Sequence, residues 1–144
     1  MKILLATDGS NFSEAAAQNI VKQFRTQDSE VRVLTVVEPL STAAVPQMSA
    51  GYYPELEDQE REARTLVERT AKMLADAGFK ASTLVLTGDA KTNILDEAAD
   101  CKADLIVVGS HGRRGLGRFL LGSVSEAIAR HTSCSVEIVR LPAK

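Results

Sequence analysis

The residues best suited to chemistry lie in a glycine-rich stretch near the end of the chain. Residues 109–123 read GSHGRRGLGRFLLGS, and a helix is predicted to follow. Glycine lacks Cβ, so it can adopt positive φ and lets backbone N–H groups approach an anion closely. Gly122 and Ser123 fall at the predicted helix start, where free N–H groups and the helix dipole favour phosphate. Residues 105–125 hold three arginines and no Asp or Glu, so the stretch predicts a phosphate-binding loop.

Other interpretations of this stretch are open. The glycines could form only a long connector whose arginines are solvated. The stretch is not a Walker-type P-loop, because no Gly-Lys-Ser/Thr closes it. It also lacks a G-x-G-x-x-G run, since the glycine that follows Gly115 and Gly117 comes too late. A P-loop NTPase and a nicotinamide-dependent dehydrogenase are therefore disfavoured.

The elements around this loop alternate between buried strands and amphipathic helices. Apolar or β-branched runs predict five strands, at 3–6, 31–37, 81–86, 104–108 and 136–139. Helices are predicted from 11, over 55–77, from 89 and over 123–131. Two of them should begin at capping boxes, Asn11 with Glu14 and Ser123 with Glu126. The alternation predicts an α/β fold: one domain over 1–144 with a doubly wound, Rossmann-like, five-stranded parallel sheet and helices on both faces.

In a sheet of this kind, ligands bind at the carboxyl ends of the strands, where the winding direction reverses. The candidate site elements are therefore Thr7–Gly9, Val36–Glu38 and the stretch from Gly109 onward. Residues 38–54 hold three of the four prolines and show no periodicity. A loop of that length in a small domain is usually functional or mobile.

Bulk composition disfavours several functions. The 144 residues carry a net charge of −2, which gives no electrostatic reason to bind nucleic acid or an acidic membrane surface. Cys101 and Cys134 form no metal-binding pattern with the two histidines, and we expect them as reduced thiols. The N-terminal apolar run ends at Asp8, which makes it too short for the apolar region of a signal peptide. The sequence also contains no run of about 18 apolar residues, the length that a membrane-spanning helix requires. We therefore expect a cytoplasmic protein with no membrane partner.

The spacing Gly109-x2-Gly112-x9-Gly122-Ser123 resembles the ATP-binding signature of the universal stress protein family. The likeness covers nearly the whole chain: KILLATDGS at the start, LTVVEP in the second strand, DLIVVGSHG in the fourth and SCSVEIV in the last. Thr35 departs from the pattern, because members often have His before the valine of the second strand. The resemblance implies an adenine nucleotide alpha hydrolase-like fold, ATP and Mg²⁺ as ligands, and a role in the stress response.

The resemblance also implies roles for individual residues. Asp8, with Ala6 and Thr7, would approach the adenosine or a metal-bound phosphate, which makes Asp8 the candidate Mg²⁺ ligand. Val36 would meet the adenine through its backbone. The residues flanking the nucleoside or surrounding the phosphates would be Val108, Gly109, His111, Gly112, Arg113, Gly122, Ser123, Val124 and Ser125. Members commonly form homodimers through the last strand, here Ser135 to Arg140, whose apolar residues suit an edge that needs a partner.

The sequence offers no complete set of catalytic residues. Phosphoryl transfer needs a positioned nucleophile, a base and usually more than one metal ligand, and only Asp8 has a clear position near the site. Ser110, Ser123 and Ser125 have no obvious His or Asp partner, which argues against a hydrolase triad. A receiver-type phosphoacceptor also lacks support, since Asp8 stands alone and the fourth strand ends in Gly109. We therefore expect at most slow ATP hydrolysis.

Two functional hypotheses from different classes follow. The first is an ATP-binding regulatory dimer whose nucleotide changes its conformation or its choice of partner. The alternative is a nucleotide-free dimeric interaction module of the same fold, acting through residues 38–54 and its last strand. Binding of adenine nucleotide discriminates between them.

Overall fold

The computed structural model describes residues 1–39, 54–111 and 121–141. In this part of the chain, five parallel strands form one sheet in the order β3-β2-β1-β4-β5. The strands are β1 (Lys2–Ala6), β2 (Glu30–Val37), β3 (Lys80–Thr87), β4 (Leu105–Gly109) and β5 (Ser135–Val139). The helices are α1 (Asn11–Gln23), the one-turn η1 (Thr26–Asp28), α2 (Pro54–Asp76), α3 (Ala90–Asp100) and α4 (Ser123–His131). The predicted doubly wound α/β fold is confirmed, and each predicted strand lies within one residue of its observed bounds.

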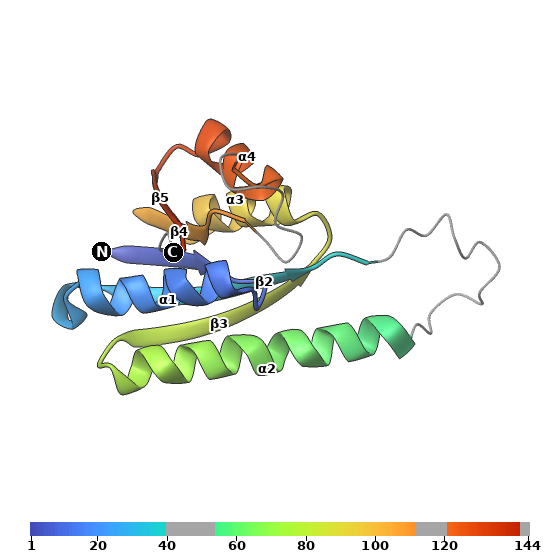
Figure 1. Ribbon diagram of the computed structural model, residues 1–144, viewed down its shortest axis with the longest axis horizontal. Helices are drawn as coiled ribbons and strands as arrows, with labels where there is room; N and C mark the ends of the chain where they lie inside the picture. The colour runs from blue at the N-terminus through green and yellow to red at the C-terminus, as the bar shows by residue number, and fades with distance from the viewer. Residues whose placement is uncertain (40–53, 112–120, 142–144) are drawn as a thin grey trace.

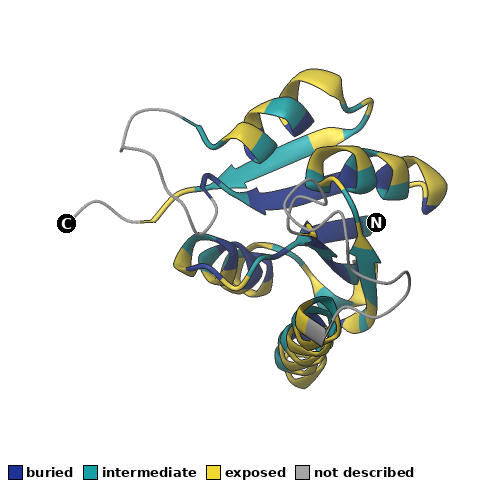
Figure 2. Ribbon diagram, turned by 90° about the vertical axis from the view of Figure 1, so that its right-hand side faces the viewer, coloured by how far each residue is buried: buried dark blue, intermediate teal, exposed yellow. Residues whose placement is uncertain are grey.

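Two layers of helices cover the sheet (Figure 1). α1 and α2 pack on one face, in a cluster that includes Ile3 and Leu5 of β1. α3 and α4 pack on the other face, in a cluster that includes Leu4 and Ile106. Successive strand residues therefore belong to opposite layers, as the pleat of a strand requires. Figure 2 shows the same division by burial, with buried strands at the centre and exposed outer faces on the helices.

Both predicted capping boxes are wrong by one residue. Ser10, not Asn11, is the N-cap of α1, because Ser10 is extended and its Oγ accepts a hydrogen bond from the Ser13 N–H at 3.2 Å. Gly122, not Ser123, is the N-cap of α4, and no side chain among the residues that the structure describes caps that helix. The Gly122 N–H donates to the Ser110 carbonyl at 2.7 Å, and this contact holds Gly122 outside the helix. Within the described residues, the first turn of α4 is thus open.

The two cysteines lie in different surroundings, and neither forms a disulfide. Cys101 is buried at the end of α3, and burial followed by the nearby Glu97 carboxylate raises the pKa of its thiol. Cys134 is half-buried, with its Sγ 3.2 Å from Thr132 Oγ1.

Among the described helices, none is both long and apolar enough to cross a membrane.

Candidate functional site

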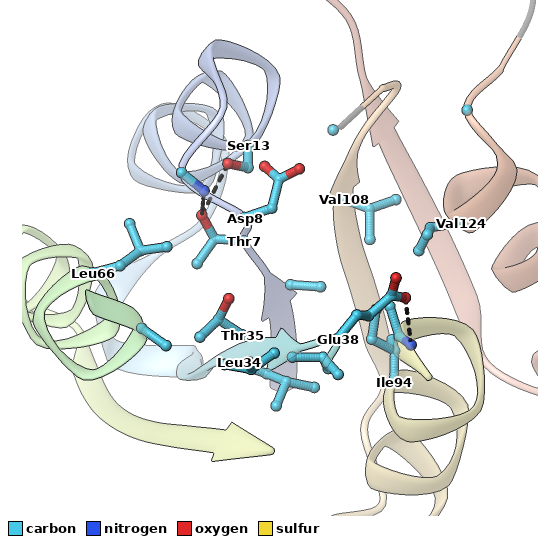
Figure 3. A pocket seen from close by; sticks show the side chains of 18 of the residues that line it. Thr7, Asp8, Ser13, Leu34, Thr35, Glu38, Leu66, Ile94, Val108 and Val124 are labelled. Atoms are coloured by element: carbon cyan, nitrogen blue, oxygen red, sulfur yellow. Dashed lines mark hydrogen bonds between the residues drawn. The ribbon is translucent and has the colours of Figure 1, made fainter. Parts of the chain in front are cut away.

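A cleft of about 920 Å³ lies at the carboxyl ends of β1, β2 and β4, where the winding direction reverses. One wall is α2, and the opposite wall is formed by α3 and the first turn of α4 (Figure 3). Of the thirteen residues predicted to contact nucleotide, eleven line this cleft: Ala6, Thr7, Asp8, Val36, Val108, Gly109, His111, Gly122, Ser123, Val124 and Ser125. Gly112 and Arg113 lie outside the described residues. Segments about 100 residues apart in sequence thus meet at one edge of the sheet.

The turn after β1 is tied to the first turn of α1. Asp8 Oδ1 accepts a hydrogen bond from the Ser10 N–H at 2.9 Å, the geometry of an Asx turn. Thr7 Oγ1 donates to Ser13 Oγ at 2.9 Å, and both side chains are buried. Gly9 adopts a φ of 81°, which a residue with Cβ adopts only at a cost. These contacts hold the half-buried Asp8 at the floor of the cleft.

The end of β2 presents backbone groups to the cleft. The Leu34 carbonyl accepts from the Thr7 N–H at 2.9 Å, whereas the Val37 carbonyl faces β3 and accepts from Gly88. Backbone groups alternate in direction along a strand, so the N–H and C=O of Val36 face the same side as those of Leu34. β1 ends at Ala6, opposite Leu34. The Val36 backbone therefore extends past the end of β1, where a planar heterocycle can pair with it.

The two described glycines of the loop lie where backbone comes close to backbone. Neither Gly109 nor Gly122 adopts positive φ, so these two positions do not use the conformational freedom of glycine. A Cβ on Gly109 would lie 2.7 Å from the backbone carbonyl carbon of Phe12 in α1. A Cβ on Gly122 would lie 3.1 Å from the Ser110 carbonyl oxygen. Gly109 therefore leaves no room for a Cβ, whereas a Cβ on Gly122 would be tight but within reach of small shifts.

A buried hydrogen-bond network joins the end of β4 to the start of α4. Ser125 Oγ lies 3.0 Å from both the Ser110 and the Gly122 carbonyl oxygens. Ser110 Oγ lies 3.1 Å from His111 Nδ1, so this serine does have a histidine partner, contrary to the sequence-based prediction. Ser110 is only 1 % exposed, which keeps it away from any substrate. The His111 ring packs against Phe12, and its Nε2 is buried with no hydrogen-bond partner among the described residues.

Three helices begin at the cleft, and they differ in what occupies their first turn. Ser10 caps α1, and the Asp89 carboxylate caps α3 by accepting from the Thr92 N–H at 3.0 Å. The hydrogen bonds from Thr92 lower the pKa of Asp89 below its ordinary value of 3.8. Glu38 adds a second carboxylate at α3, accepting from the Ala90 N–H at 3.0 Å (Figure 3). Side chains thus cap α1 and α3, which leaves α4 as the helix start suited to an external anion.

The model of the universal stress protein family matches residues 1–140 of this chain. The chain belongs to the universal stress protein family. Universal stress protein MJ0531 of Methanocaldococcus jannaschii is 35% identical over 147 residues, which cover 99% of this chain and 84% of that protein. The solved structure of hypothetical protein MJ0577, from the same organism, has a TM-score of 0.85 at 30% identity and covers 99% of this chain and 97% of that chain. A universal stress protein family protein of Arabidopsis thaliana with AMP bound has a TM-score of 0.70 at 23% identity, covering 99% and 93%, and shows the same fold.

Some lining residues of this universal stress protein fold were missed by the sequence analysis. They come mainly from one face of α2: Gln59, Arg61, Glu62, Ala63, Thr65, Leu66 and Arg69. No local sequence pattern predicts that these residues line the cleft, because the periodicity of α2 indicates only which of its residues face the core. Thr35, the position where the sequence analysis found a departure from the family pattern, also lines the cleft and is 6 % exposed.

The donor set of the cleft fits a nucleotide-bound Mg²⁺ better than a metal site built from protein alone. The described residues contain no group of three or more His, Cys, Asp or Glu side chains placed to hold a metal. Three carboxylates line the cleft, those of Asp8, Glu38 and Glu62, and Glu38 is bound to the start of α3. Mg²⁺ in nucleotide sites is usually held by one or two carboxylates together with phosphates and waters. Asp8 fits the first of these roles.

Proposed function

We propose that the cleft binds ATP with Mg²⁺ and that the chain works as a regulatory dimer in the stress response, hydrolysing ATP slowly or not at all. The first turn of α4, which no described side chain caps, is the observation that carries this proposal. Ser123, Val124 and Ser125 present there the N–H groups that a helix cannot satisfy internally. Carboxylates or hydroxyls already occupy the starts of α1 and α3, so the phosphates belong at α4.

The adenosine would lie between the phosphates and β2. The backbone of Val36 extends past the end of β1 and offers an adjacent donor and acceptor, the pattern that an adenine edge requires. Val108, Val124 and Ile94 form apolar walls beside it (Figure 3). Asp8 stands where it can accept from ribose hydroxyls or ligate Mg²⁺. The AMP bound by the Arabidopsis thaliana protein supports an adenine nucleotide as ligand.

The described part of the site favours binding over turnover. The single serine–histidine contact is buried, and no carboxylate among the described residues bonds to that histidine. Mg²⁺ bound to the phosphates would neutralise their charge, and Asp8, its candidate ligand, would also position the ribose. No described side chain is both exposed to the cleft and activated as a nucleophile or base. We therefore infer a sensor of nucleotide rather than a fast ATPase.

Thermal unfolding with and without ATP and Mg²⁺ tests this proposal, with AMP and GTP as comparison ligands. A ligand at a hundred times its Kd adds roughly 2.7 kcal/mol to stability. The midpoint should then rise by about 5–10 °C for a domain of this size. No shift at millimolar ATP, together with no nucleotide released on denaturation, would contradict the proposal. That outcome would favour the nucleotide-free interaction module.

The outer edge of β5 supports the proposed homodimer. β5 ends the described sheet, and the Val139 carbonyl faces inward to accept from the Ser110 N–H. The backbone groups of Val136 and Ile138 therefore face outward. Ile138→Pro, which removes an outward N–H, should convert a dimer to a monomer in sedimentation equilibrium while circular dichroism stays unchanged. A wild-type chain that is monomeric at all concentrations, or a folded proline variant that remains dimeric, would contradict the dimer.

A further inference from the structure

Apart from Thr7, the α2 side of the cleft holds none of the residues proposed to contact nucleotide. β2 residues alternate between the two layers, so Leu34 and Val36 face α3 and α4. Thr35, between them, faces α1 and α2 with Val31 and Val33. Figure 3 shows Thr7, Thr35 and Leu66 grouped on the α2 side of the cleft, apart from Val108 and Val124 on the α4 side. We call this region the α2 lobe and define it by Thr7, Ser13, Thr35, Ala63, Leu66 and Arg69.

Most polar side chains in and beside the α2 lobe already have partners. Thr7 Oγ1 donates to Ser13 Oγ, and Ser13 Oγ donates to the Ser10 carbonyl at 3.0 Å. Thr65, on the adjoining surface of α2, donates to the Arg61 carbonyl at 3.1 Å. These hydroxyl protons are therefore unavailable to a ligand.

Two side chains of the lobe, Thr35 and Arg69, have donors without a partner among the described residues. Thr35 is 6 % exposed, and its hydroxyl makes no hydrogen bond with any described residue. Arg69 lines the lobe and forms no ion pair within the described residues, whereas Arg61 pairs with Asp58 at 3.1 Å. Among the described residues, His111 Nε2 is the one buried side-chain polar atom without a partner, so the Thr35 hydroxyl opens onto the cleft, where water or a ligand can bind it.

The chemistry of these two donors is that of an anion site. Arg offers only donors, arranged as a fork that matches a phosphoryl or carboxylate group, and a threonine hydroxyl can add one more. Ala63 and Leu66 lie beside them and lower the local dielectric, which strengthens the attraction to an anion. Glu62 is the opposing charge on this wall, but it lies seven residues from Arg69, about 10 Å along the helix axis.

We propose that the α2 lobe is a second anion-binding subsite, in which Arg69 and Thr35 hold a phosphoryl or carboxylate group. The group belongs either to a nucleotide that carries a second anionic substituent or to a separate small anion bound beside the nucleotide. The first possibility rests on the proposed function, whereas the position of Arg69 and Thr35 in the lining of the cleft does not. The subsite would let the protein distinguish among adenine nucleotides by what they carry beyond the phosphates at α4.

The decisive comparison is Arg69→Gln against Arg64→Gln. Both arginines are exposed on α2, but only Arg69 lines the cleft, so the second variant controls for loss of charge. Pyrophosphate is titrated by calorimetry into each of the two variants. The titration is then repeated with each variant combined with Ser123→Asp, which prevents anion binding at the start of α4. Loss of a charge-assisted pair should weaken pyrophosphate binding about tenfold in Arg69→Gln and leave Arg64→Gln unchanged. Thr35→Val should give a smaller loss.

A second titration identifies the source of the anion. If adenosine 3′,5′-bisphosphate binds more tightly than AMP, and Arg69→Gln removes that advantage, the anion is part of the nucleotide. If only the binding of pyrophosphate depends on Arg69, the anion is a molecule separate from the nucleotide. That result would support the subsite even if no nucleotide binds. Equal affinities of Arg69→Gln and Arg64→Gln for both probes would overturn the subsite. Failure of ATP and AMP to bind would instead count against the proposed function.

Discussion

Replacing Ser123 with Asp should abolish ATP binding while leaving the fold at least as stable. The new carboxylate would stand at the first position of α4, where it repels phosphate and occupies the open N–H groups. The same carboxylate interacts favourably with the helix dipole, worth roughly 0.3–1 kcal/mol of stability. We expect the Kd for ATP to rise by about 100-fold or more, equivalent to roughly 2.7 kcal/mol. Calorimetric titration and thermal unfolding measure the two effects on one sample.

Two control variants make this result specific. Gln18→Glu adds the same charge at an exposed position of α1 that does not line the cleft, so it should leave ATP affinity unchanged. Ser123→Asn has nearly the size of the aspartate without its charge and should weaken binding only a few-fold. A folded Ser123→Asp variant that keeps its ATP affinity would show that the phosphates do not lie at α4. The proposed orientation of the nucleotide would then be wrong.

Gly109→Ala should destabilise the protein strongly, although it adds a single methyl group. The new Cβ would lie 2.7 Å from both the carbonyl carbon and the Cβ of Phe12, inside van der Waals contact. A helix backbone cannot move aside as the tip of a flexible side chain can, so α1 would have to shift away from β4. Overpacking of this kind costs about 3 kcal/mol. The unfolding midpoint should fall by about 10 °C.

Gly122→Ala is the matched comparison for this second prediction. Its Cβ would meet the Ser110 carbonyl oxygen at 3.1 Å and the His111 Cα at 3.2 Å, which is tight but within reach of small shifts. Its φ of −64° suits alanine, so we expect the smaller loss of the two. Urea titration of both variants gives the free energies of unfolding. A loss below about 1 kcal/mol for Gly109→Ala would mean that α1 is not fixed against β4.

Local sequence patterns were sufficient to predict the elements and their order. The apolar run that contains Ile106 and Val107 predicts a buried parallel strand, because such a run can be recognised without knowing which distant residues pack against it. Alternation of such strands with helices then predicts the winding of the sheet and hence the edge that holds the site. Asp8 and Val36 were placed at the cleft by that topology, together with the family resemblance. The short-range physics of burial and chain connectivity accounts for this success.

Only the tertiary structure decided why particular residues occupy the site. Gly109 is required because Phe12 of α1 packs against it, a contact across nearly 100 residues of sequence that no local rule predicts. The caps of α1 and α4 shifted by one residue because Ser10 and Gly122 have extended backbone and make specific hydrogen bonds there.

The α2 lobe shows the same limit most clearly. Thr35 and Arg69 line the same cleft because α2 packs on β2, and helical periodicity marks only the residues of α2 that reach the core. By itself, the sequence determined the fold, its strand order along the chain and the edge that carries the cleft, since these follow from local burial patterns and connectivity. Among the described residues, the tertiary structure decided which helix start is open and which donors lack partners, because those depend on contacts between distant segments.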